Sequence, residues 1–135
     1  MRSGGDTTMD YALTTIRHFR KQIPKTTVIA RWTMLELRPT CEHCNKALPP
    51  ESLEARICTY ECTFCATCVE NVLENVCPNC GGGFVPRPIR PSNNWKGDNF
   101  LGKDPAGTKV KHRPVDPAAH ALFVASIKTI PPEKR

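Results

Sequence analysis

The stretch CEHCNKALPPESLEARICTYECTFCATCVENVLENVCPNC, residues 41–80, holds all eight cysteines of this 135-residue chain. The cysteines follow the spacing C-x2-C-x13-C-x3-C-x2-C-x2-C-x8-C-x2-C. One residue in five of this stretch is a thiol, which leaves too few large apolar side chains for an ordinary core. The spacing therefore predicts that bonds to sulfur hold the fold together, either as disulfides or as metal–thiolate bonds.

Metal–thiolate bonds are the better explanation. Disulfides occur mainly in exported proteins, and residues 1–33 contain no apolar run of the kind that forms a secretory signal. No window of the sequence is long and apolar enough to span a membrane, so we expect a cytoplasmic protein with no membrane contact. Two residues between cysteines let one turn of chain, a knuckle, present both sulfurs to one tetrahedral ion.

Zinc is the metal that we expect, with two Zn²⁺ ions per chain. Four thiolates in a tetrahedron suit both zinc and iron, so iron or an iron–sulfur cluster is the alternative. A rubredoxin-like iron site needs only two C-x2-C knuckles, and this chain has more ligands than one such site explains. A site closed by four cysteines leaves no position for a reacting water, so we expect a structural role and no enzymatic activity.

The eight thiolates can pair in two ways. A sequential pairing assigns the first four cysteines to one ion and the last four to the other. An interleaved pairing assigns ligands one, two, five and six to one ion. The crowding of four cysteines into residues 58–68 favours interleaving. It does not decide the question, because interleaving also separates Cys62 from Cys65.

The second half of the cysteine stretch resembles a RING finger. Phe64 to Cys68, a short helical run from Val69 to Asn75 and the knuckle Cys77-Pro78-Asn79-Cys80 follow the RING order, with Cys62 where most RING domains carry histidine. The resemblance implies interleaving: Cys41, Cys44, Cys65 and Cys68 form site 1, and Cys58, Cys62, Cys77 and Cys80 form site 2. It also implies a small metal-stabilised α+β fold, a RING-like cross-braced treble clef with largely irregular flanks. By the same analogy, we expect Glu42, Leu48, Phe64 and the helix from Val69 to face a protein partner.

A second resemblance concerns the run Met34-Leu35-Glu36-Leu37-Arg38-Pro39, just before the first knuckle. This run is similar to the opening of a small bacterial family of cysteine-rich proteins of unknown function. The resemblance extends from Met34 to Pro91 and, more weakly, from Pro105 to Pro117. It implies a fold but no particular activity.

Charge and composition divide the chain into three segments. The net charge is +4 in residues 1–33, −4 in residues 34–80 and +6 in residues 81–135. We expect residues 1–33 to be an extension or a poorly ordered leader, with an amphipathic helix over 9–23 as the alternative. Residues 34–90 are the RING-like zinc module, with a strand over 56–60. Residues 91–135 are a basic tail rich in proline and glycine, with a helix over 117–128 that Asp116 and Pro117 begin.

The function that we expect is a zinc-binding protein-interaction or adaptor module. One alternative is a nucleic-acid-binding regulatory protein that uses its basic flanks, with the cations Arg17, Arg20, Lys21, Lys109, Lys111, His112 and Arg113. A RING-type ubiquitin-ligase-like adaptor is disfavoured by Glu42 after the first ligand and Gly81 after the last. A thiolate redox or metal sensor is a further alternative. We expect His43 to turn away from the ion, and none of His18, His112 and His120 to be catalytic.

Overall fold

The computed structural model describes residues 34–135. The leader, its predicted helix over 9–23 and the cations before residue 34 lie outside the described residues. Residues Glu36–Arg135 form one compact unit. Within the described part of the chain, no helix is long and apolar enough to cross a membrane.

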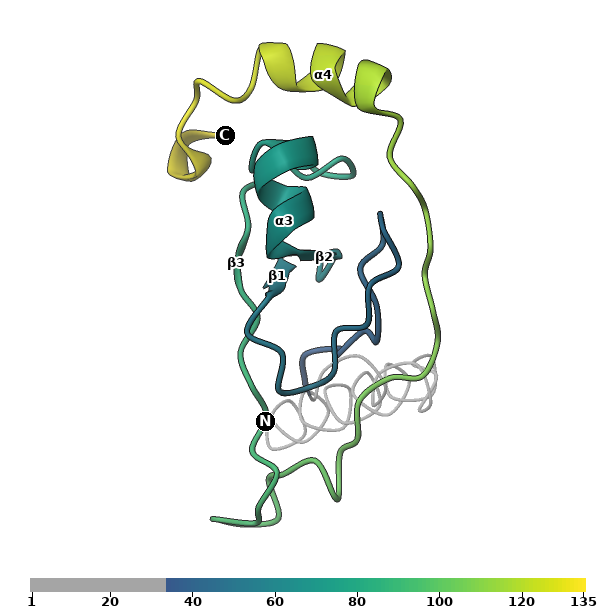
Figure 1. Ribbon diagram of the computed structural model, residues 1–135. Coiled ribbons are helices and arrows are strands. Elements are labelled where there is room, and N and C mark those ends of the chain that lie inside the picture. The colour runs from purple at the N-terminus through teal and green to yellow at the C-terminus, as the bar shows by residue number, and fades with distance from the viewer. Residues whose placement is uncertain (1–33) are drawn as a thin grey trace, which may run out of the picture. The chain divides into compact units, whose positions relative to one another are not determined.

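A three-stranded antiparallel sheet lies at the centre of the unit (Figure 1). Its strands are β1 (Ala55–Ile57), β2 (Thr63–Cys65) and β3 (Val85–Pro86), in the order β2-β1-β3. The first strand pairs Ala55 with Cys65 of β2, and Ile57 with Val85 of β3. The strand predicted over 56–60 ends at Ile57, because the chain turns from Cys58 and re-enters the sheet at Thr63.

One short helix follows β2 directly. It consists of an α-helical turn, α3 (Ala66–Cys68), and a π-helical turn, η1 (Val69–Leu73). Glu74 and Asn75 both have left-handed backbones, with φ of 51° and 59°, and they end the helix. Apolar side chains of this helix face inward, since Val69 and Leu73 are buried while Glu70 is exposed.

The basic tail returns to the cysteine-rich part of the chain. After β3 it runs without helix or strand to residue 116, and it is visible as the green trace along one side of Figure 1. The amide of Gly107 donates to the carbonyl of Leu37 at 2.9 Å, and the amide of Arg113 donates to the carbonyl of Glu42 at 2.7 Å. Most of the tail is irregular, but these bonds attach it to the segment before β1.

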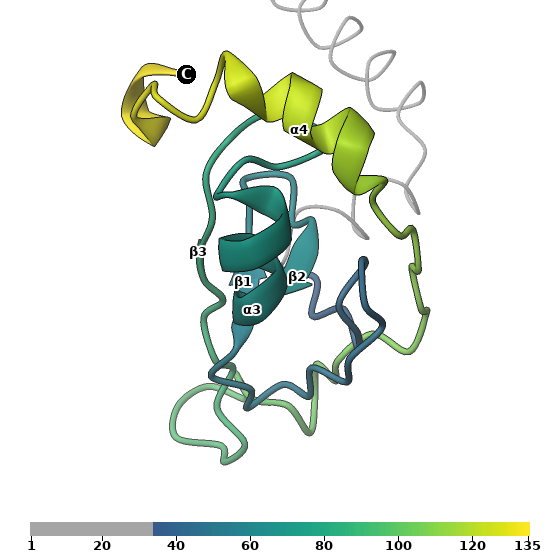
Figure 2. The same cartoon turned by 45° about the horizontal axis from the view of Figure 1, so that its top comes forward.

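The tail ends in two helices, α4 (Pro117–Ala125) and the 3₁₀ turn η2 (Pro132–Lys134). The carboxylate of Asp116 caps α4 by accepting from the amide of Ala118 at 3.1 Å. The helix ends three residues before the predicted residue 128. Figure 2 shows α4 lying across the end of the α3–η1 helix. There the ring of His120 lies 3.0 Å from the carbonyl of Leu73, and Val124 is fully buried.

The core is built around sulfur. Its buried cluster contains six cysteines and five other side chains: Cys41, Cys58, Cys62, Cys65, Cys68, Cys77, Leu48, Ala55, Phe64, Val69 and Leu73. The prediction that Glu42, Leu48 and Phe64 form a partner-facing surface is wrong, because these residues are only 4%, 1% and 1% exposed. Phe64 packs edge-on against Phe84, with the ring centroids 5.5 Å apart.

Arg87 links the sheet to the segment that carries the first knuckle. Its guanidinium is buried and donates to the carbonyls of Arg38, Leu48 and Pro49 at 2.9, 3.1 and 3.0 Å. Burial lowers the pKa of Arg87. Arg87 therefore fastens the segment that carries the first knuckle to the sheet, in addition to that segment's own backbone bonds, such as the one from the amide of Leu48 to the carbonyl of Pro39 at 2.8 Å.

Candidate metal centre

The first knuckle, residues 41–46, has a backbone closed by two hydrogen bonds. The amide of Asn45 donates to the carbonyl of Cys41 at 2.9 Å, and the amide of Cys41 donates to the carbonyl of Lys46 at 2.9 Å. Asn45 has a φ of 63°, in the left-handed region that asparagine tolerates better than most residues. This turn brings Cys41 and Cys44 to the same side of the chain.

The second knuckle, residues 77–82, repeats this pattern. The amide of Gly81 donates to the carbonyl of Cys77 at 2.8 Å, and the amide of Cys77 donates to the carbonyl of Gly82 at 2.8 Å. Gly81 has a φ of 78°. We did not predict these turns, although the sequence carries a signal for them: Asn45 and Gly81 directly follow these two C-x2-C pairs, and Asn and Gly are the residues that best accept a left-handed backbone.

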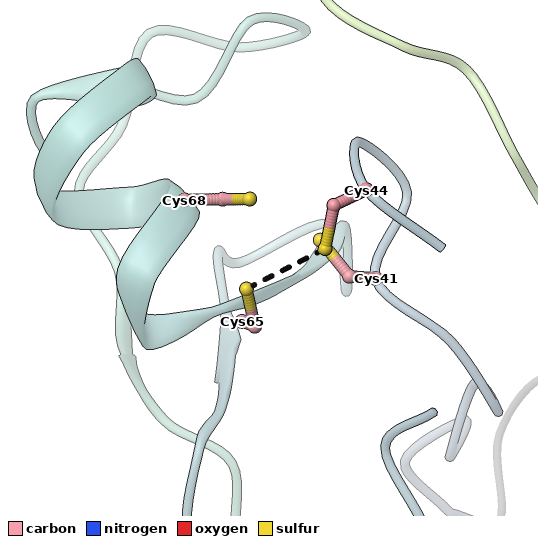
Figure 3. A group of neighbouring side chains, drawn as sticks. All are labelled: Cys41, Cys44, Cys65 and Cys68. Carbon is pink, nitrogen blue, oxygen red and sulfur yellow. Dashed lines mark hydrogen bonds between the residues drawn. The ribbon is translucent and has the colours of Figure 1, made fainter. Parts of the chain in front are cut away.

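The first sulfur group contains Cys41, Cys44, Cys65 and Cys68, whose Sγ atoms all lie within 4.8 Å of one another. Figure 3 shows the sulfurs of the knuckle facing those of Cys65, at the end of β2, and Cys68, in α3. The Sγ atoms of Cys44 and Cys65 are 3.8 Å apart. A tetrahedron with metal–sulfur bonds of about 2.3 Å has edges of about 3.8 Å, whereas a disulfide requires about 2.0 Å. The group therefore suits one four-coordinate metal ion.

The second sulfur group, among the described residues, contains Cys58, Cys62 and Cys77 within the same limit of 4.8 Å. All three are buried. The structure does not bring Cys80, the fourth predicted ligand of site 2, into this group. Cys80 is exposed, and its Sγ accepts from the amide of Gly82 at 3.4 Å.

Hydrogen bonds concentrate negative charge on one sulfur of the second group. The thiol of Cys77 donates to Cys62 and lowers the pKa of Cys62 to about 5, against the opposing effect of burial. The side-chain amide of Asn79 also donates to the Sγ of Cys62, at 3.3 Å. The same bond to Cys62, together with burial, raises the pKa of Cys77. A thiolate is the form that binds a metal, so this group is prepared to accept a cation.

In the first group, burial raises the pKa of Cys41, and the backbone amides of Cys44, Cys65 and His43 oppose that effect. Burial also raises the pKa of Cys68, and a hydrogen bond with Cys65 adds to the effect. A metal ion must displace these protons, as it does whenever it binds cysteine.

The two residues between the cysteines of the first knuckle attach it to the rest of the fold. The buried carboxylate of Glu42 accepts from the guanidinium of Arg38 at 2.7 Å and from the amide of Thr63 at 2.6 Å. Since Thr63 lies in β2, this carboxylate connects the knuckle to the strand that carries Cys65. The ring of His43 accepts from the amide of Val115 through Nδ1 at 2.9 Å, so it binds the tail.

The remaining described histidines take part in packing and backbone contacts. His120 is buried against Leu73. The ring of His112 lies 3.2 Å from the carbonyl of His43. His18 lies outside the described residues.

Fold and site together define a small α+β protein with two cysteine groups, each able to bind a metal ion. A family described as "Protein of unknown function (DUF1272)" matches residues 34–90. The "Uncharacterized protein R02474" of Rhizobium meliloti (strain 1021) is 55% identical over 75 residues, which cover 56% of this chain and 82% of that protein. The chain belongs to the DUF1272 family, which confirms the predicted resemblance to bacterial cysteine-rich proteins. No solved structure matches the chain.

Proposed function

We propose that this protein is a zinc-stabilised interaction module that holds two Zn²⁺ ions and presents a surface to a protein partner, without catalysis of its own. Site 1 is Cys41, Cys44, Cys65 and Cys68, and site 2 is Cys58, Cys62, Cys77 and Cys80. The ions then cross-brace the chain in the manner of a RING-like treble clef, because each one joins segments distant in sequence. We place the protein in the cytoplasm, where zinc–thiolate sites persist and disulfides are rare.

The observation that carries this proposal is the first sulfur group. Four thiols gathered within 4.8 Å, with one pair at the edge length of a zinc–sulfur tetrahedron, have no other common use in a small protein. Zinc suits an all-thiolate tetrahedron and needs no redox partner. Because the cysteines make up most of the buried cluster, the ions contribute directly to folding.

The surface that favours a protein partner is the outer face of α4. Its exposed side chains Ala118, Ala121, Leu122 and Ala125 follow one another at helical spacing, and Leu122 is 82% exposed. The only ionisable residue of this helix is His120, which is buried. A face without exposed charge does not attract the phosphates of a nucleic acid, but it fits the apolar side of a partner protein.

Elemental analysis of the purified protein tests the zinc sites. We expect two zinc ions per chain in the natural protein and one in the Cys65→Ser, Cys68→Ser variant. Iron, or one ion in the natural protein, would contradict the cross-braced arrangement.

Affinity capture followed by chemical cross-linking tests the partner surface. We expect Leu122→Asp to abolish capture while leaving the zinc content at two, since Leu122 makes little contact within the protein. Glu70→Lys, an exposed charge change on the η1 helix, is the matched control and should retain the partner. Capture that survives Leu122→Asp, or a nucleic acid in place of a protein, would reject this surface.

A further inference from the structure

We propose that site 2 holds its ion through Cys58, Cys62 and Cys77, and that Cys80 is an exchangeable ligand whose place a small-molecule thiol can take. This inference rests on the proposed binding of zinc, and it adds to it a ligand site on the metal. Site 1 differs, because the sulfurs of its four ligands all lie within 4.8 Å of one another.

Cys80 is placed differently from the other three ligands of site 2. The three buried sulfurs of its site lie within 4.8 Å of one another, and Cys80 is outside that group. Cys80 borders a shallow hollow with Tyr60 and Asn79, and Tyr60 is 72% exposed. It also borders a neighbouring hollow lined by Gly82 and Phe84. A small molecule therefore reaches Cys80 from solvent without any movement of the core.

Cys44 is the residue of the first knuckle that corresponds to Cys80. Cys44 is also exposed, yet its sulfur lies within its group, 3.8 Å from Cys65. The two knuckles have the same pair of backbone hydrogen bonds. Neither exposure nor the backbone hydrogen bonds separate the two cysteines, yet only the sulfur of Cys44 lies within its group.

The middle residues of the two knuckles make different contacts. Glu42 and His43 attach the first knuckle to β2 and to the tail. The corresponding residues of the second knuckle are Pro78, which has no amide hydrogen, and Asn79, whose side chain donates to Cys62. The second knuckle is held instead at Gly81, whose carbonyl accepts from the guanidinium of Arg135 at 3.3 Å, and neither Pro78 nor Asn79 fixes Cys80, which borders the hollow.

The exchange needs no oxidant. An incoming thiol gives its proton to solvent, and its sulfur bonds to the ion as a thiolate. The bond between the ion and Cys80 breaks, and the sulfur of Cys80 takes up a proton. The ion keeps four sulfur ligands and the charge of the site is unchanged, so the step is a ligand substitution at constant coordination number. The class of ligand is a low-molecular-weight thiol, small enough to enter beside Tyr60.

The experiment compares the full chain with Cys80→Ala and Cys44→Ala, because alanine offers no substitute ligand atom. Metal content and zinc affinity are measured by competition with a chromophoric chelator. We expect Cys80→Ala to keep two ions, with the affinity of site 2 lowered less than about tenfold. We expect Cys44→Ala to lower the affinity of site 1 more than about a hundredfold. Equal losses in the two variants would overturn the inference while leaving zinc binding intact.

A second measurement uses Co²⁺ in place of zinc, since its thiolate-to-metal absorption reports the number of bound sulfurs. Added 2-mercaptoethanol should restore the absorption that Cys80→Ala loses and leave that of Cys44→Ala unchanged. No response in Cys80→Ala would also overturn the inference. A natural protein that binds no metal would instead reject the proposed function itself, so the two failures are distinguishable.

Discussion

The two knuckles, residues 41–46 and 77–82, have the same backbone conformation, but their middle residues contact different parts of the protein. Both are closed by the same two hydrogen bonds, and both have a left-handed residue after the second cysteine. The first directs Glu42 into the fold, where it binds Arg38 and β2. The second directs Asn79 back to its own site. The middle residues therefore differ in role. Glu42 attaches its knuckle to β2, whereas Asn79 contacts a sulfur of its own site, and the second knuckle is attached instead at Gly81, whose carbonyl accepts from Arg135 at 3.3 Å.

The largest expected effect comes from removing the metal. Structural zinc contributes about 10–16 kcal/mol of apparent binding free energy, which equals or exceeds the whole stability of a typical domain, about 5–15 kcal/mol. We therefore expect a strong chelator to unfold residues 36–135, as measured by loss of dispersion in an NMR spectrum, and added zinc to restore the fold.

A series of chelators of different strength distinguishes the two sites in this experiment. A weak chelator should remove the ion of site 2 first, because Cys80 stands outside its group, and one ion should remain with Cys41 and Cys44. Simultaneous loss of both ions at every chelator strength would mean that the two sites are equally closed. A fully folded protein without metal would contradict the proposal that the cysteine core depends on zinc.

Glu42→Ala should have the next largest effect. It leaves the guanidinium of Arg38 buried without its main partner, and breaking a buried pair in this way costs about 3–5 kcal/mol. We expect about 3 kcal/mol, because Glu36 also lies 3.4 Å from Arg38. Chemical denaturation of the zinc-loaded protein measures the loss.

Pro78→Ala is the matched control, at the same place in the second knuckle. Pro78 is partly exposed, and among the described residues it has no buried ion pair to lose. We expect its substitution to change the free energy of unfolding by less than about 1 kcal/mol. Equal effects of the two substitutions would show that Glu42 does not attach the first knuckle as the structure indicates.

Local sequence patterns predicted the helices, because neighbouring residues determine where a helix begins. The RING-like order of residues 64–80 predicted a short helix from Val69, and Asp116 with Pro117 predicted the start of α4. The tail contacts were not predictable, because they depend on single long-range bonds such as that between Arg113 and Glu42. A proline-rich segment carries no periodic signal for where it will pack.

In the candidate metal centre, too, the sequence predicted some features and long-range packing determined the others. Cysteine spacing predicted metal-binding thiols, and the resemblance to a RING finger implied their grouping. Neither could show that Cys80 lies outside the group of Cys58, Cys62 and Cys77, since the position of an exposed side chain depends on the final packing. The error at Glu42 has a clear physical cause. A charged residue beside a ligand is usually on the surface, and only the placement of Arg38 and the Thr63 amide makes its burial favourable.

Gly81→Ala should have a moderate effect. At a φ of 78° an alanine side chain is strained, which costs about 1–2 kcal/mol. The added carbon has room, since its nearest neighbour, in Phe123, is 3.6 Å away. We expect thermal unfolding of the zinc-loaded protein to move to lower temperature.

The matched change in the first knuckle is Asn45→Gly, which relieves a left-handed residue. It should leave the unfolding temperature nearly unchanged or raise it slightly. A loss of stability from Asn45→Gly as large as that from Gly81→Ala would mean that the side chain of Asn45, and not its backbone conformation, is what the first knuckle requires.

Asn79→Ala should have the smallest effect, and it tests the comparison most directly. It removes one hydrogen bond to the sulfur of Cys62, worth about 1 kcal/mol, which corresponds to about a fivefold change in an equilibrium or a rate. A sulfur without that donor is more exposed to competing protons and ligands. We therefore expect the ion of site 2 to be released to a chelator about fivefold faster, and the free energy of unfolding of the zinc-loaded protein to fall by no more than about 1 kcal/mol.

His43→Ala, at the same place in the first knuckle, should show the opposite pattern. It removes the bond to the amide of Val115, so the tail loses one attachment while the sulfurs of site 1 keep their ligand geometry. Metal release from site 1 should stay constant and protection of the Val115 amide from hydrogen exchange should fall. If each variant instead altered both metal release and tail protection, the middle residues of a knuckle would not act separately on the site and on the fold, and the difference between the two knuckles would be one of degree.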